Sequence, residues 1–583
     1  MDVLNERRQS FAQKSVEWTP KPIHQFFFAM ADRYQSSDYI VTERKTWSYR
    51  ETHDEVLKLA LSLYELGIKK DDHVALIFPN FPEFIFSKLA CSTIGAVTVP
   101  LNYKLKQEEL KYLINQSNSS YLIVIDEWNS YNFIDAIVAL SPEIFRGKAS
   151  DVFPNLKKII VFSPNGRKYE GTLDLYELMS SSDKQEALPL ITALQLERNI
   201  DVNDITDVMY TSGTTSLPKG VLVTHDMLWR SAYGSCLNRG FQEGRRTFIP
   251  IPFFHTFGLV EGVLASMFIG GAVIPQLEFN VDEAIFLIEK FKVNDVVCVP
   301  TIALKSVEAQ RKNPRDLSSL KAMYCAGSEV SVRLWKELKD ELQIDELITG
   351  YGMTELAAGV LQTDPNDELS FLTNYVGKTI PGGHIGLKEL NGNNIAFKIR
   401  DPETGEIFNA NREGELICRG PLVTKGYYDK PKETAEAFTE DGWFRTGDLA
   451  FIHENGYISL TGRLKEIYRM GAENVAPKEI EDVITNHSSV NQAYVIGVPD
   501  PVMGEVGMAW IVLEPGASLT KEEILDYLTS RLARFKIPKY IKFVEHSELP
   551  LNQIGKVQKF RLKEWYESEK VKVESLILKK LTR

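Results

Sequence analysis

The segment from Asp207 to Thr224, DVMYTSGTTSLPKGVLVT, combines an apolar run, a run of small hydroxyl and glycine residues, and a lysine. Hydroxyl groups, exposed backbone N–H groups and a glycine that permits close approach together suit the oxygen atoms of a phosphate. The segment is not a Walker A loop, because no Gly-Lys-Ser/Thr sequence ends it and no helix follows directly. The candidate phosphate-binding residues are Thr211, Ser212, Gly213, Thr214, Thr215 and Lys219.

A second segment, Gly350-Tyr-Gly-Met-Thr-Glu355, follows an apolar run and brings an aromatic ring, a hydroxyl and a carboxylate together. It begins like a dinucleotide-binding fingerprint, but Glu355 occupies the position of the third glycine, which excludes that motif. A single carboxylate suits Mg²⁺, which takes its remaining ligands from phosphate oxygens and water. Taken alone, the segment is better explained by a buried tyrosine and a helix-capping glutamate.

Two further positions have chemistry that suits a nucleotide. Gly327 ends an apolar segment in Cys325-Ala-Gly-Ser-Glu329, where a glycine lets the backbone approach a planar ligand. Asp448, in Trp443-Phe-Arg-Thr-Gly-Asp448, precedes an expected strand, and its carboxylate can accept both hydroxyls of a ribose. A Thr-Gly-Asp sequence alone indicates only a turn, so this position becomes informative through its spacing from Gly462-Arg463.

These segments occur in the order found in the adenylate-forming superfamily, which includes acyl-CoA synthetases, non-ribosomal peptide adenylation domains and firefly luciferase. The chain resembles this superfamily from Thr46 to about Lys563. The resemblance implies that Tyr351 stacks on adenine, Thr354 contacts the α-phosphate and Glu355 helps to hold Mg²⁺. It also implies that Lys556, in Leu549–Lys556, is the catalytic lysine that bridges the attacking carboxylate and the α-phosphate. The other ATP- or AMP-binding residues that it implies are Gly327, Ser328, Glu329, Gly350, Gly352, Asp448 and Arg463.

The chain departs from the usual residues of the superfamily at three places. Ser216 stands where the phosphate-binding loop usually has glycine, and Ser328-Glu329 replaces the end of a common Gly-Gly-Ala-Pro turn. Gly471-Ala472 replaces a Gly-Gly pair that lines the pantetheine tunnel of coenzyme A. The additional methyl group of Ala472 narrows that tunnel slightly.

The segment from Pro252 to Gly258, PFFHTFG, resembles the wall of the acyl pocket, with Phe254, His255 and Phe257 as its lining residues. Peptide adenylation domains carry an aspartate here that pairs with the ammonium group of an amino acid. No acidic residue lies between Pro252 and Gly258, and burying an unpaired ammonium group is costly. We therefore expect a carboxylic acid without an amino group, either aliphatic or aryl.

The resemblance implies an AMP-forming acyl-CoA synthetase that uses ATP, Mg²⁺ and coenzyme A. The acid would form an acyl-adenylate, and a smaller domain would then rotate about a hinge at Lys465 so that a thiol can take the acyl group. An alternative acceptor is the phosphopantetheine arm of an acyl carrier protein. A non-enzymatic nucleotide sensor on the same fold and a luciferase-type oxygenation are further alternatives. The length or ring preference of the acid and the oligomeric state stay open.

The elements that must position these residues alternate between helical and strand patterns from Thr46 onwards, which predicts an α/β fold with parallel sheets covered by helices. From about residue 390, short alternating segments with Asn-Gly turns indicate antiparallel hairpins. We therefore predict parallel-sheet α/β subdomains with a small β-barrel subdomain in an N-terminal domain, residues 1–464. A smaller, mobile α+β domain is predicted for residues 465–583.

The composition limits the function and the location. A net charge of −12 argues against a nucleic-acid-binding protein. Five scattered cysteines without a C-x-x-C pair fit a reducing compartment, and no zinc site is visible. The N-terminus lacks the apolar core of a signal peptide, and the apolar stretch from Gly262 to Pro275 is too short to span a membrane. We predict a cytoplasmic enzyme whose tail, residues 570–583, is a solvated extension rather than a helix that contacts a membrane or a partner.

Overall fold

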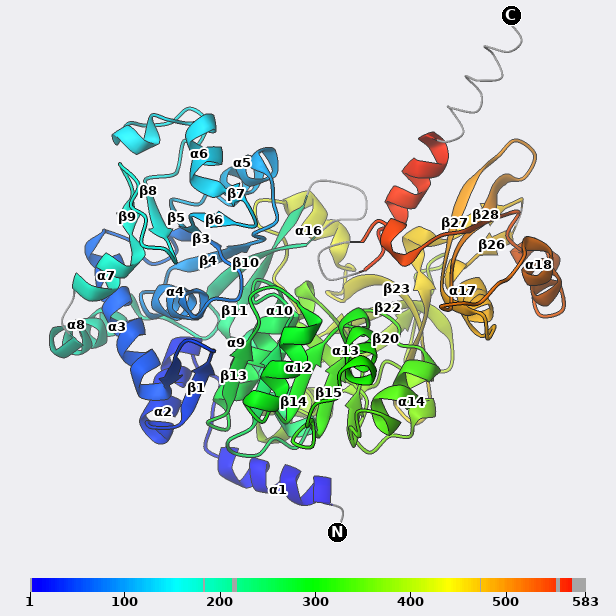
Figure 1. Ribbon diagram of the computed structural model, residues 1–583, viewed down its shortest axis with the longest axis horizontal. Helices are drawn as coiled ribbons and strands as arrows, with labels where there is room; N and C mark the ends of the chain where they lie inside the picture. Colours follow the sequence, from blue (N-terminus) through cyan, green and yellow to red (C-terminus); the bar gives the residue numbers. More distant parts are fainter. Residues whose placement is uncertain (1–2, 182–183, 212–217, 472, 552–555, 569–583) are drawn as a thin grey trace, which may run out of the picture.

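The computed structural model describes residues 3–181, 184–211, 218–471, 473–551 and 556–568. Within these residues, two parallel sheets with their helices and a small β subdomain form the N-terminal part, and a smaller α+β unit follows (Figure 1). The predicted fold class is therefore confirmed. The tail at 570–583 lies outside the described residues.

The first seven-stranded sheet has the order β11-β10-β4-β3-β5-β8-β9. All neighbouring strands are parallel except the hairpin pair β10 and β11. Most of its strands are buried along their length, as expected for a sheet covered on both faces. The strands are β3 (His73–Ile77), β4 (Val97–Leu101), β5 (Tyr121–Ile125), β8 (Lys158–Phe162), β9 (Leu173–Asp174), β10 (Ile205–Thr211) and β11 (Lys219–Thr224).

The second seven-stranded sheet has the order β16-β15-β14-β12-β13-β1-β2 and is parallel except at its β1–β2 edge. It shares one continuous apolar core with the first sheet. The strands are β1 (Asp38–Val41), β2 (Thr46–Ser48), β12 (Arg246–Ile249), β13 (Ala272–Pro275), β14 (Asp295–Cys298), β15 (Ala322–Cys325) and β16 (Glu346–Ile348).

Helices cover the two sheets. In α3 a capping box between Ser48 and Glu51 begins the helix at Tyr49. The apolar stretch around Gly262 is a buried helix followed by β13, and the first part of this helix is the π-helix η2 (Leu259–Leu264). The main helices are α2 (Ile23–Tyr34), α3 (Tyr49–Glu65), α4 (Pro82–Thr93), α5 (Gln107–Gln116), α6 (Phe133–Leu140), α7 (Leu175–Ser181), α8 (Lys184–Arg198), α9 (His225–Asn238), α12 (Val281–Lys290), α13 (Pro300–Lys312) and α14 (Val332–Asp340).

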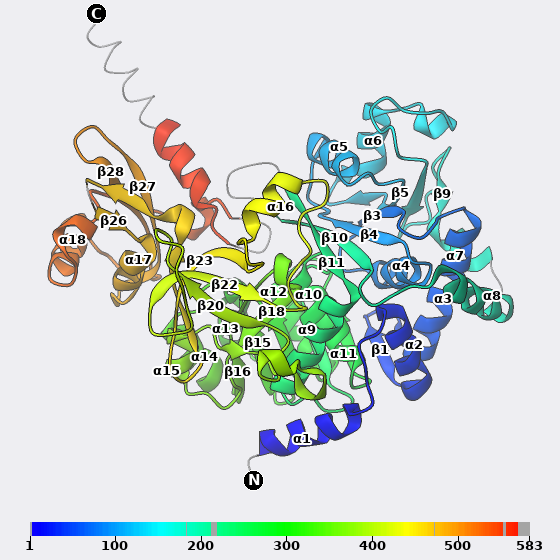
Figure 2. The ribbon, with the colours of Figure 1, turned by 180° about the vertical axis from the view of Figure 1, so that it is seen from behind.

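The N-terminal helix α1 (Val3–Ser15) lies across the outside of this α/β unit and contacts α9 (Figure 2). Arg7 pairs with Glu346 at 2.5 Å and Arg8 pairs with Asp364 at 2.8 Å. Phe11 is buried against Trp18 and Tyr233. The helix is therefore fastened to the second sheet by both charge and apolar packing.

The small β subdomain consists of two antiparallel sheets around a common core. Pairing of Gly377 with Ile458 joins the two sheets, which agrees with the predicted barrel-like unit. The first sheet contains β17 (Gly350–Met353), β18 (Ala358–Gln362) and β19 (Lys378–Thr379). The second contains β20 (Ala396–Arg400), β21 (Ile407–Phe408), β22 (Glu413–Arg419), β23 (Phe444–Ile452) and β24 (Ile458–Arg463).

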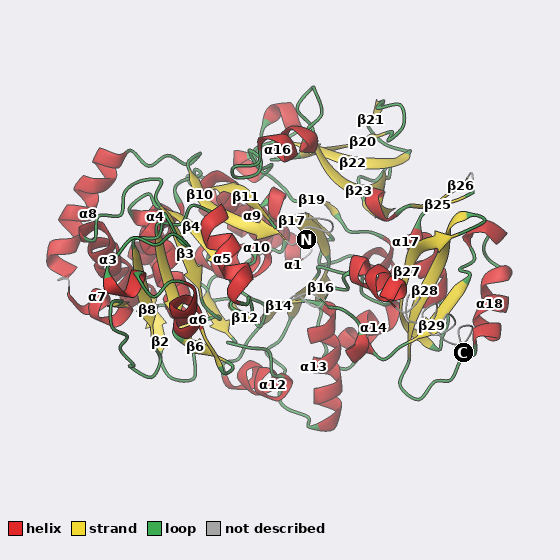
Figure 3. Ribbon diagram, turned by 90° about the horizontal axis from the view of Figure 1, so that it is seen from above, coloured by secondary structure: helices red, strands yellow, loops and turns green. Residues whose placement is uncertain are grey.

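The C-terminal unit lies beside this β subdomain and away from the first parallel sheet (Figure 3). Alternating residues of its two long strands enter different cores: Val495 and Ala509 face one core, and Ile496 and Trp510 face the other. The elements are β25 (Tyr468–Met470), β26 (Glu473–Val475), α17 (Pro477–Thr485), β27 (Val490–Asp500), β28 (Gly504–Leu513), α18 (Lys521–Thr529), β29 (Tyr540–Phe543) and a helix over 559–568.

A short 3-10 turn, η6 (Leu464–Glu466), connects the two parts of the chain, because it joins β24 of the β subdomain to β25 of the C-terminal sheet. All five cysteines are buried as free thiols. None of the helices in the described ranges is both long and apolar enough to span a membrane.

Candidate active site

The predicted phosphate-binding segment is a hairpin between β10 and β11, in which Thr211 lies opposite Lys219 at the base of the loop. Ser212, Gly213, Thr214 and Thr215 lie outside the described residues. The ammonium group of Lys219 lies 4.8 Å from the ring centroid of Tyr427, a cation–π contact. The N–H of Tyr428 donates to the carbonyl of Gly220 at 2.7 Å, so residues 427–428 lie against the strand that carries Lys219 and stabilise it.

Glu355 lies beside this lysine, in the 3-10 turn η3 (Thr354–Leu356) between β17 and β18. The hydroxyl of Tyr427 donates to Oε1 of Glu355 at 3.0 Å. Burial raises the pKa of Glu355, while the Tyr427 hydrogen bond and the charges of Lys219 and Arg463 oppose that rise. After η3, Ala357 adopts φ +67, a left-handed conformation that is unusual for alanine and returns the chain into β18.

The donor set fits the Mg²⁺ that the resemblance implies. Among the described residues, no three His, Cys, Asp or Glu side chains form a metal-binding cluster. A single buried carboxylate such as Glu355, close to the base of the predicted phosphate-binding hairpin, suits an ion that takes most of its ligands from phosphate and water.

Asp448 is the centre of a second group of residues. Its Oδ2 accepts a hydrogen bond of 2.7 Å from the hydroxyl of Tyr351, and its Oδ1 pairs with Nε of Arg463 at 2.8 Å. Burial and the neighbouring Asp448 raise the pKa of Tyr351 well above its ordinary value. Asp448 lies within β23 opposite Arg463 on β24, not ahead of a strand as we expected. The sequence Thr-Gly-Asp resembles a turn because Gly447 has a positive φ, at a point where the pairing of this strand is irregular.

Lys556 of the C-terminal unit lies close to this group. Part of the Lys556 residue is exposed to solvent. Its ammonium group is enclosed by protein, and this loss of hydration lowers its pKa to about 8. Arg463 contributes to this lowering, whereas Asp448 and Glu466 oppose it. The structure therefore brings together Lys556, Arg463 and Asp448, which come from separate segments of the sequence. Residues 552–555, which precede the lysine, lie outside the described residues.

Ion pairs hold the C-terminal unit in this arrangement. Glu329, in the turn after β15, pairs with Lys478 on α17. Arg333 on α14 pairs with Glu514 at 2.8 Å. Two further pairs lie within the C-terminal unit itself: Lys559 pairs with Glu466, next to the predicted hinge, at 2.6 Å and with Glu481 at 2.8 Å.

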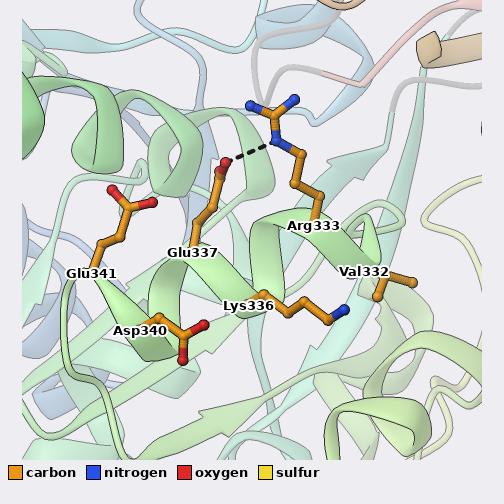
Figure 4. Close-up of a pocket in the computed structure, with 6 residues that line it drawn as sticks. All are labelled: Val332, Arg333, Lys336, Glu337, Asp340 and Glu341. Atoms are coloured by element: carbon orange, nitrogen blue, oxygen red, sulfur yellow. Dashed lines mark hydrogen bonds and ion pairs between the residues drawn. The ribbon is translucent and has the colours of Figure 1, made fainter. Parts of the chain in front are cut away.

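The outer face of α14 carries a shallow hollow of ≈ 400 Å³, in which Arg333 also pairs with Glu337 at 2.8 Å (Figure 4). Its lining residues are Val332, Arg333, Lys336, Glu337, Asp340 and Glu341. None of the predicted site residues lines it, so we assign the hollow no part in the chemistry.

The predicted acyl wall lies next to the turn that is expected to contact adenine. The ring of Phe257 packs edge-on against Tyr324 at 5.2 Å, and Tyr324 is on β15, which leads into this turn. Phe254 is buried and packs against His255. Burial lowers the pKa of His255 to about 4, so the imidazole is neutral near pH 7.

The remaining predicted residues are placed as follows. Gly327 has φ +95, which favours glycine, and Ser328 and Glu329 beside it are exposed. Gly350 allows close approach of Tyr324, since a Cβ there would lie 2.4 Å from its hydroxyl. Gly352 is exposed, and Thr354 is half-buried.

The predicted hinge residue, Lys465, is exposed in η6. The N–H of Gly471 donates to the carbonyl of Met503 at 2.8 Å, and Ala472 lies outside the described residues.

Three residues of this region were not predicted from the sequence: Tyr427, Lys478 and Lys559. Tyr427 follows Gly426 in a polar turn, and this Gly-Tyr pair was the one local signal for it. Lys478 and Lys559 occupy positions that are typical of solvated lysines. Their roles depend on partners that lie far away in the sequence.

Comparison with known families gives two matches. A family model described as AMP-binding enzyme matches residues 27–428, and a model described as AMP-binding enzyme C-terminal domain matches residues 479–556.

Similar proteins are found among both curated sequences and solved structures. The chain is 33% identical to YngI of Bacillus subtilis, provisionally named an acyl-CoA synthetase, over 92% of this chain and 95% of that protein. It is 29% identical to the mitochondrial medium-chain acyl-CoA ligase ACSF2 of Mus musculus, over 92% and 86% respectively. It superposes on ATP-bound MatB of Rhodopseudomonas palustris with a TM-score of 0.79 and 26% identity, over 93% of this chain and 99% of that one.

Proposed function

The chain belongs to the AMP-binding enzyme family, and we propose that it activates a fatty or aryl carboxylic acid with Mg·ATP and transfers the acyl group to the thiol of coenzyme A. The observation that supports this most directly is that Lys556 lies near enough to Asp448 and Arg463 for their charges to act on its ammonium group. From this position the ammonium group of Lys556 can reach the place where the resemblance to the superfamily implies that the ribose and the α-phosphate bind.

In the first half-reaction, a carboxylate oxygen of the acid attacks the α-phosphorus of ATP, and pyrophosphate leaves with the electrons of the broken P–O bond. Both reactants are negatively charged, so the positive charge of Lys556 lowers the repulsion between them. Lys219 and the hydroxyl and N–H groups of the β10–β11 hairpin hold the phosphates. Bound Mg²⁺, held by Glu355, would neutralise additional phosphate charge.

The nucleoside part is held by the Tyr351, Asp448 and Arg463 group. The Tyr351 hydroxyl and the Arg463 guanidinium fix both carboxylate oxygens of Asp448. A carboxylate held in this way can accept hydrogen bonds from the ribose hydroxyls without first having to be oriented. Tyr351 contributes its ring as the adenine contact.

In the second half-reaction, the thiol of coenzyme A attacks the acyl carbon, AMP leaves, and the thiol proton is released. We propose that the chain divides at residues 464 and 465, and that the C-terminal domain turns about Lys465 between the two steps. The exposed position of Lys465 in η6, between two separate sheets, supports this hinge. Gly471 and Ala472 would then line the thiol tunnel. A carrier-protein thiol is the alternative acceptor, since Ala472 narrows the tunnel.

The acyl wall supports an acid without an amino group. Phe254 and Phe257 are apolar, and His255 is neutral near pH 7 because burial lowers its pKa. The name of ACSF2 describes a medium-chain acyl-CoA ligase, which agrees with an apolar pocket. We propose a cytoplasmic location, supported by the five buried free thiols.

The test is a panel of fatty, aryl and amino acids assayed for ATP-dependent pyrophosphate release, first without an acceptor and then with coenzyme A or a phosphopantetheinylated carrier protein. We expect release with apolar acids, and a thioester with coenzyme A. A thioester that forms only on the carrier protein would identify the alternative acceptor. Pyrophosphate release only with amino acids would contradict the proposed substrate class.

A further inference from the structure

A buried carboxylate that the proposed chemistry does not use lies next to the acyl wall. Glu261 is fully buried in the π-helix η2, four residues after Phe257. A π-helical turn is rare and frequently occurs at functional sites. β18 packs against both η2 and α10 (Thr256–Gly258), which carries Phe257.

The two oxygens of this carboxylate have different surroundings. Oε2 accepts hydrogen bonds from the hydroxyl of Ser235 and, at 3.4 Å, from the amide of Gln362. The nearest cation is Nη1 of Arg239, at 3.9 Å from Oε2. Within the described part of the chain, Oε1 accepts no hydrogen bond of good geometry, although the N–H of Gly359 faces the carboxylate.

Tyr324 links Oε1 of Glu261 to Phe257 of the acyl wall. The Tyr324 ring contacts Phe257, and the Tyr324 hydroxyl lies near Gly359. A Cβ added to Gly359 would be 2.4 Å from that hydroxyl and 3.0 Å from Oε1 of Glu261. The hydroxyl and the carboxylate oxygen therefore converge on one point of β18, and Tyr324 connects that point to the acyl wall.

Asp295 holds both Arg239, through Nη2 at 2.5 Å, and Arg245 at 3.0 Å, so Glu261 supplies a second negative charge to this buried group. Charge balance accounts for the carboxylate but not for the surroundings of its Oε1. Oε1 of Glu261 and Nε of Arg239 nevertheless both lack a hydrogen-bond partner among the described residues. Burial, only partly offset by Arg239, raises the pKa of Glu261 to about 7. A buried acceptor without a donor is costly, and a ligand that brings a donor removes this cost.

We propose that Glu261 is a specificity-determining residue that accepts a hydrogen bond from a hydroxyl group on the acyl chain, so that the enzyme prefers a hydroxylated acid to the plain acid of equal length. This inference rests on the proposed function. A hydroxyl suits the position better than an ammonium group, because the guanidinium of Arg239 lies over the Tyr324 ring at 5.3 Å and would repel a second cation. A site that uses a buried acceptor discriminates strongly against an analogue without the donor.

The experiment compares kcat/KM for pyrophosphate release between a plain acid and hydroxy acids of the same length, with the hydroxyl at successive carbons. Wild type should prefer one positional isomer over the plain acid by roughly tenfold or more. Glu261→Leu should reduce this ratio to one or below, and Glu261→Gln should reduce it several-fold. Glu83→Gln, a change at a buried carboxylate that bonds to Tyr176, is the matched control and should keep the wild-type ratio.

Several outcomes would overturn the inference. One is a wild-type enzyme that shows no positional preference, a measurement that needs no variant to fold. Another is a ratio that is the same in wild type and both Glu261 variants. A preference for an ω-amino acid over the hydroxy acid would also contradict the hydroxyl assignment. Failure of the proposed function has a different signature, because the wild-type enzyme would then release no pyrophosphate with any acid of the panel.

Discussion

Glu329 forms an ion pair with Lys478, and this contact joins the turn after β15 to the first turn of α17 in the C-terminal unit. Arg333 and Glu514 form a second pair across the same interface, at 2.8 Å. The turn that the superfamily resemblance assigns to adenine is thereby linked to the part of the chain that carries Lys556. The two pairs support the arrangement in which Lys556 lies near Asp448.

Removing the first pair should shift the balance between the two half-reactions. We expect Lys478→Ala and Glu329→Gln to slow adenylate formation and leave thioester formation unchanged or faster. Since Glu329 is largely exposed, its pair contributes about 0.2–1 kcal/mol, which corresponds to no more than about a fivefold change in rate. Rapid-quench assays of each half-reaction measure this, with Lys432→Ala, from an exposed pair on α16 (Pro431–Ala437), as control. Equal slowing of both halves would contradict it.

Asp448→Ala should raise the KM for ATP and depress both half-reactions, because the carboxylate is expected to hold the ribose. Each charge-assisted hydrogen bond that is lost contributes roughly 1.5–3 kcal/mol. The change also removes the partner of Tyr351 and Arg463. Tyr351→Phe is therefore the companion variant, since it removes one bond to Asp448 and keeps the ring, and we expect a smaller effect from it. Unchanged ATP kinetics in Asp448→Ala would exclude the residue from the site.

The lowered pKa of Lys556 predicts a pH dependence for adenylate formation. Lys556 must be protonated to offset the charge of the reactants, and its pKa of about 8 lies below the ordinary value for lysine. The value of kcat/KM for pyrophosphate release should therefore be highest below pH 8 and fall as the pH rises through about 8. Thioester formation from supplied acyl-adenylate should not fall over this range. Lys556→Arg, if active, should shift the decline to higher pH, because a guanidinium stays protonated.

Acid length should affect binding through the apolar wall of Phe254 and Phe257. Each additional buried CH₂ contributes up to roughly 0.8 kcal/mol, or about fourfold in kcat/KM, until the pocket is filled. A series of straight-chain acids should therefore show a steady rise and then a plateau or a decline. Preferential activation of a free amino acid would contradict an apolar pocket. Phe257→Ala should extend the rise to longer acids.

The fold was predictable where local patterns are decisive. Alternating apolar segments indicated the strands from His73 to Asp126, and these strands lie in one parallel sheet. The capping box of Ser48 follows the Ser-x-x-Glu pattern, which a sequence displays because all its partners lie within one turn. The π-helix around Glu261 and the left-handed Ala357 had no such local signal, since tertiary packing imposes both conformations.

The site was predictable as a set of segments but not as a set of contacts. Thr211, Tyr351, Glu355, Asp448 and Lys556 were found from residue type, spacing and resemblance. The contacts between these side chains join strands that are distant in the sequence. One example is the hydrogen bond from Tyr351 of β17 to Asp448 of β23. The cations Lys478 and Lys559 have long-range partners and look like surface lysines in the sequence, so periodicity could not reveal them.

Domain alternation gives the most discriminating prediction, because it assigns opposite defects to two lysines. Lys556→Ala should abolish adenylate formation and leave thioester formation from supplied acyl-adenylate nearly intact, since the cation is needed only while the acid attacks ATP. Lys465→Pro should do the opposite. Proline fixes φ at the predicted hinge and disfavours the helical conformation of Leu464, so it restricts the turn while both binding surfaces persist.

Lys465→Ala is the matched control for this test, because it removes the exposed side chain but keeps the freedom of the backbone. It should behave like wild type in both half-reactions, and a defect equal to that of Lys465→Pro would mean that the side chain, not the swivel, matters. Pre-steady-state measurement of each half-reaction separates these cases. If Lys556→Ala slows both halves to the same extent, the lysine acts in a domain arrangement common to both steps, and rotation about Lys465 is not needed to explain catalysis.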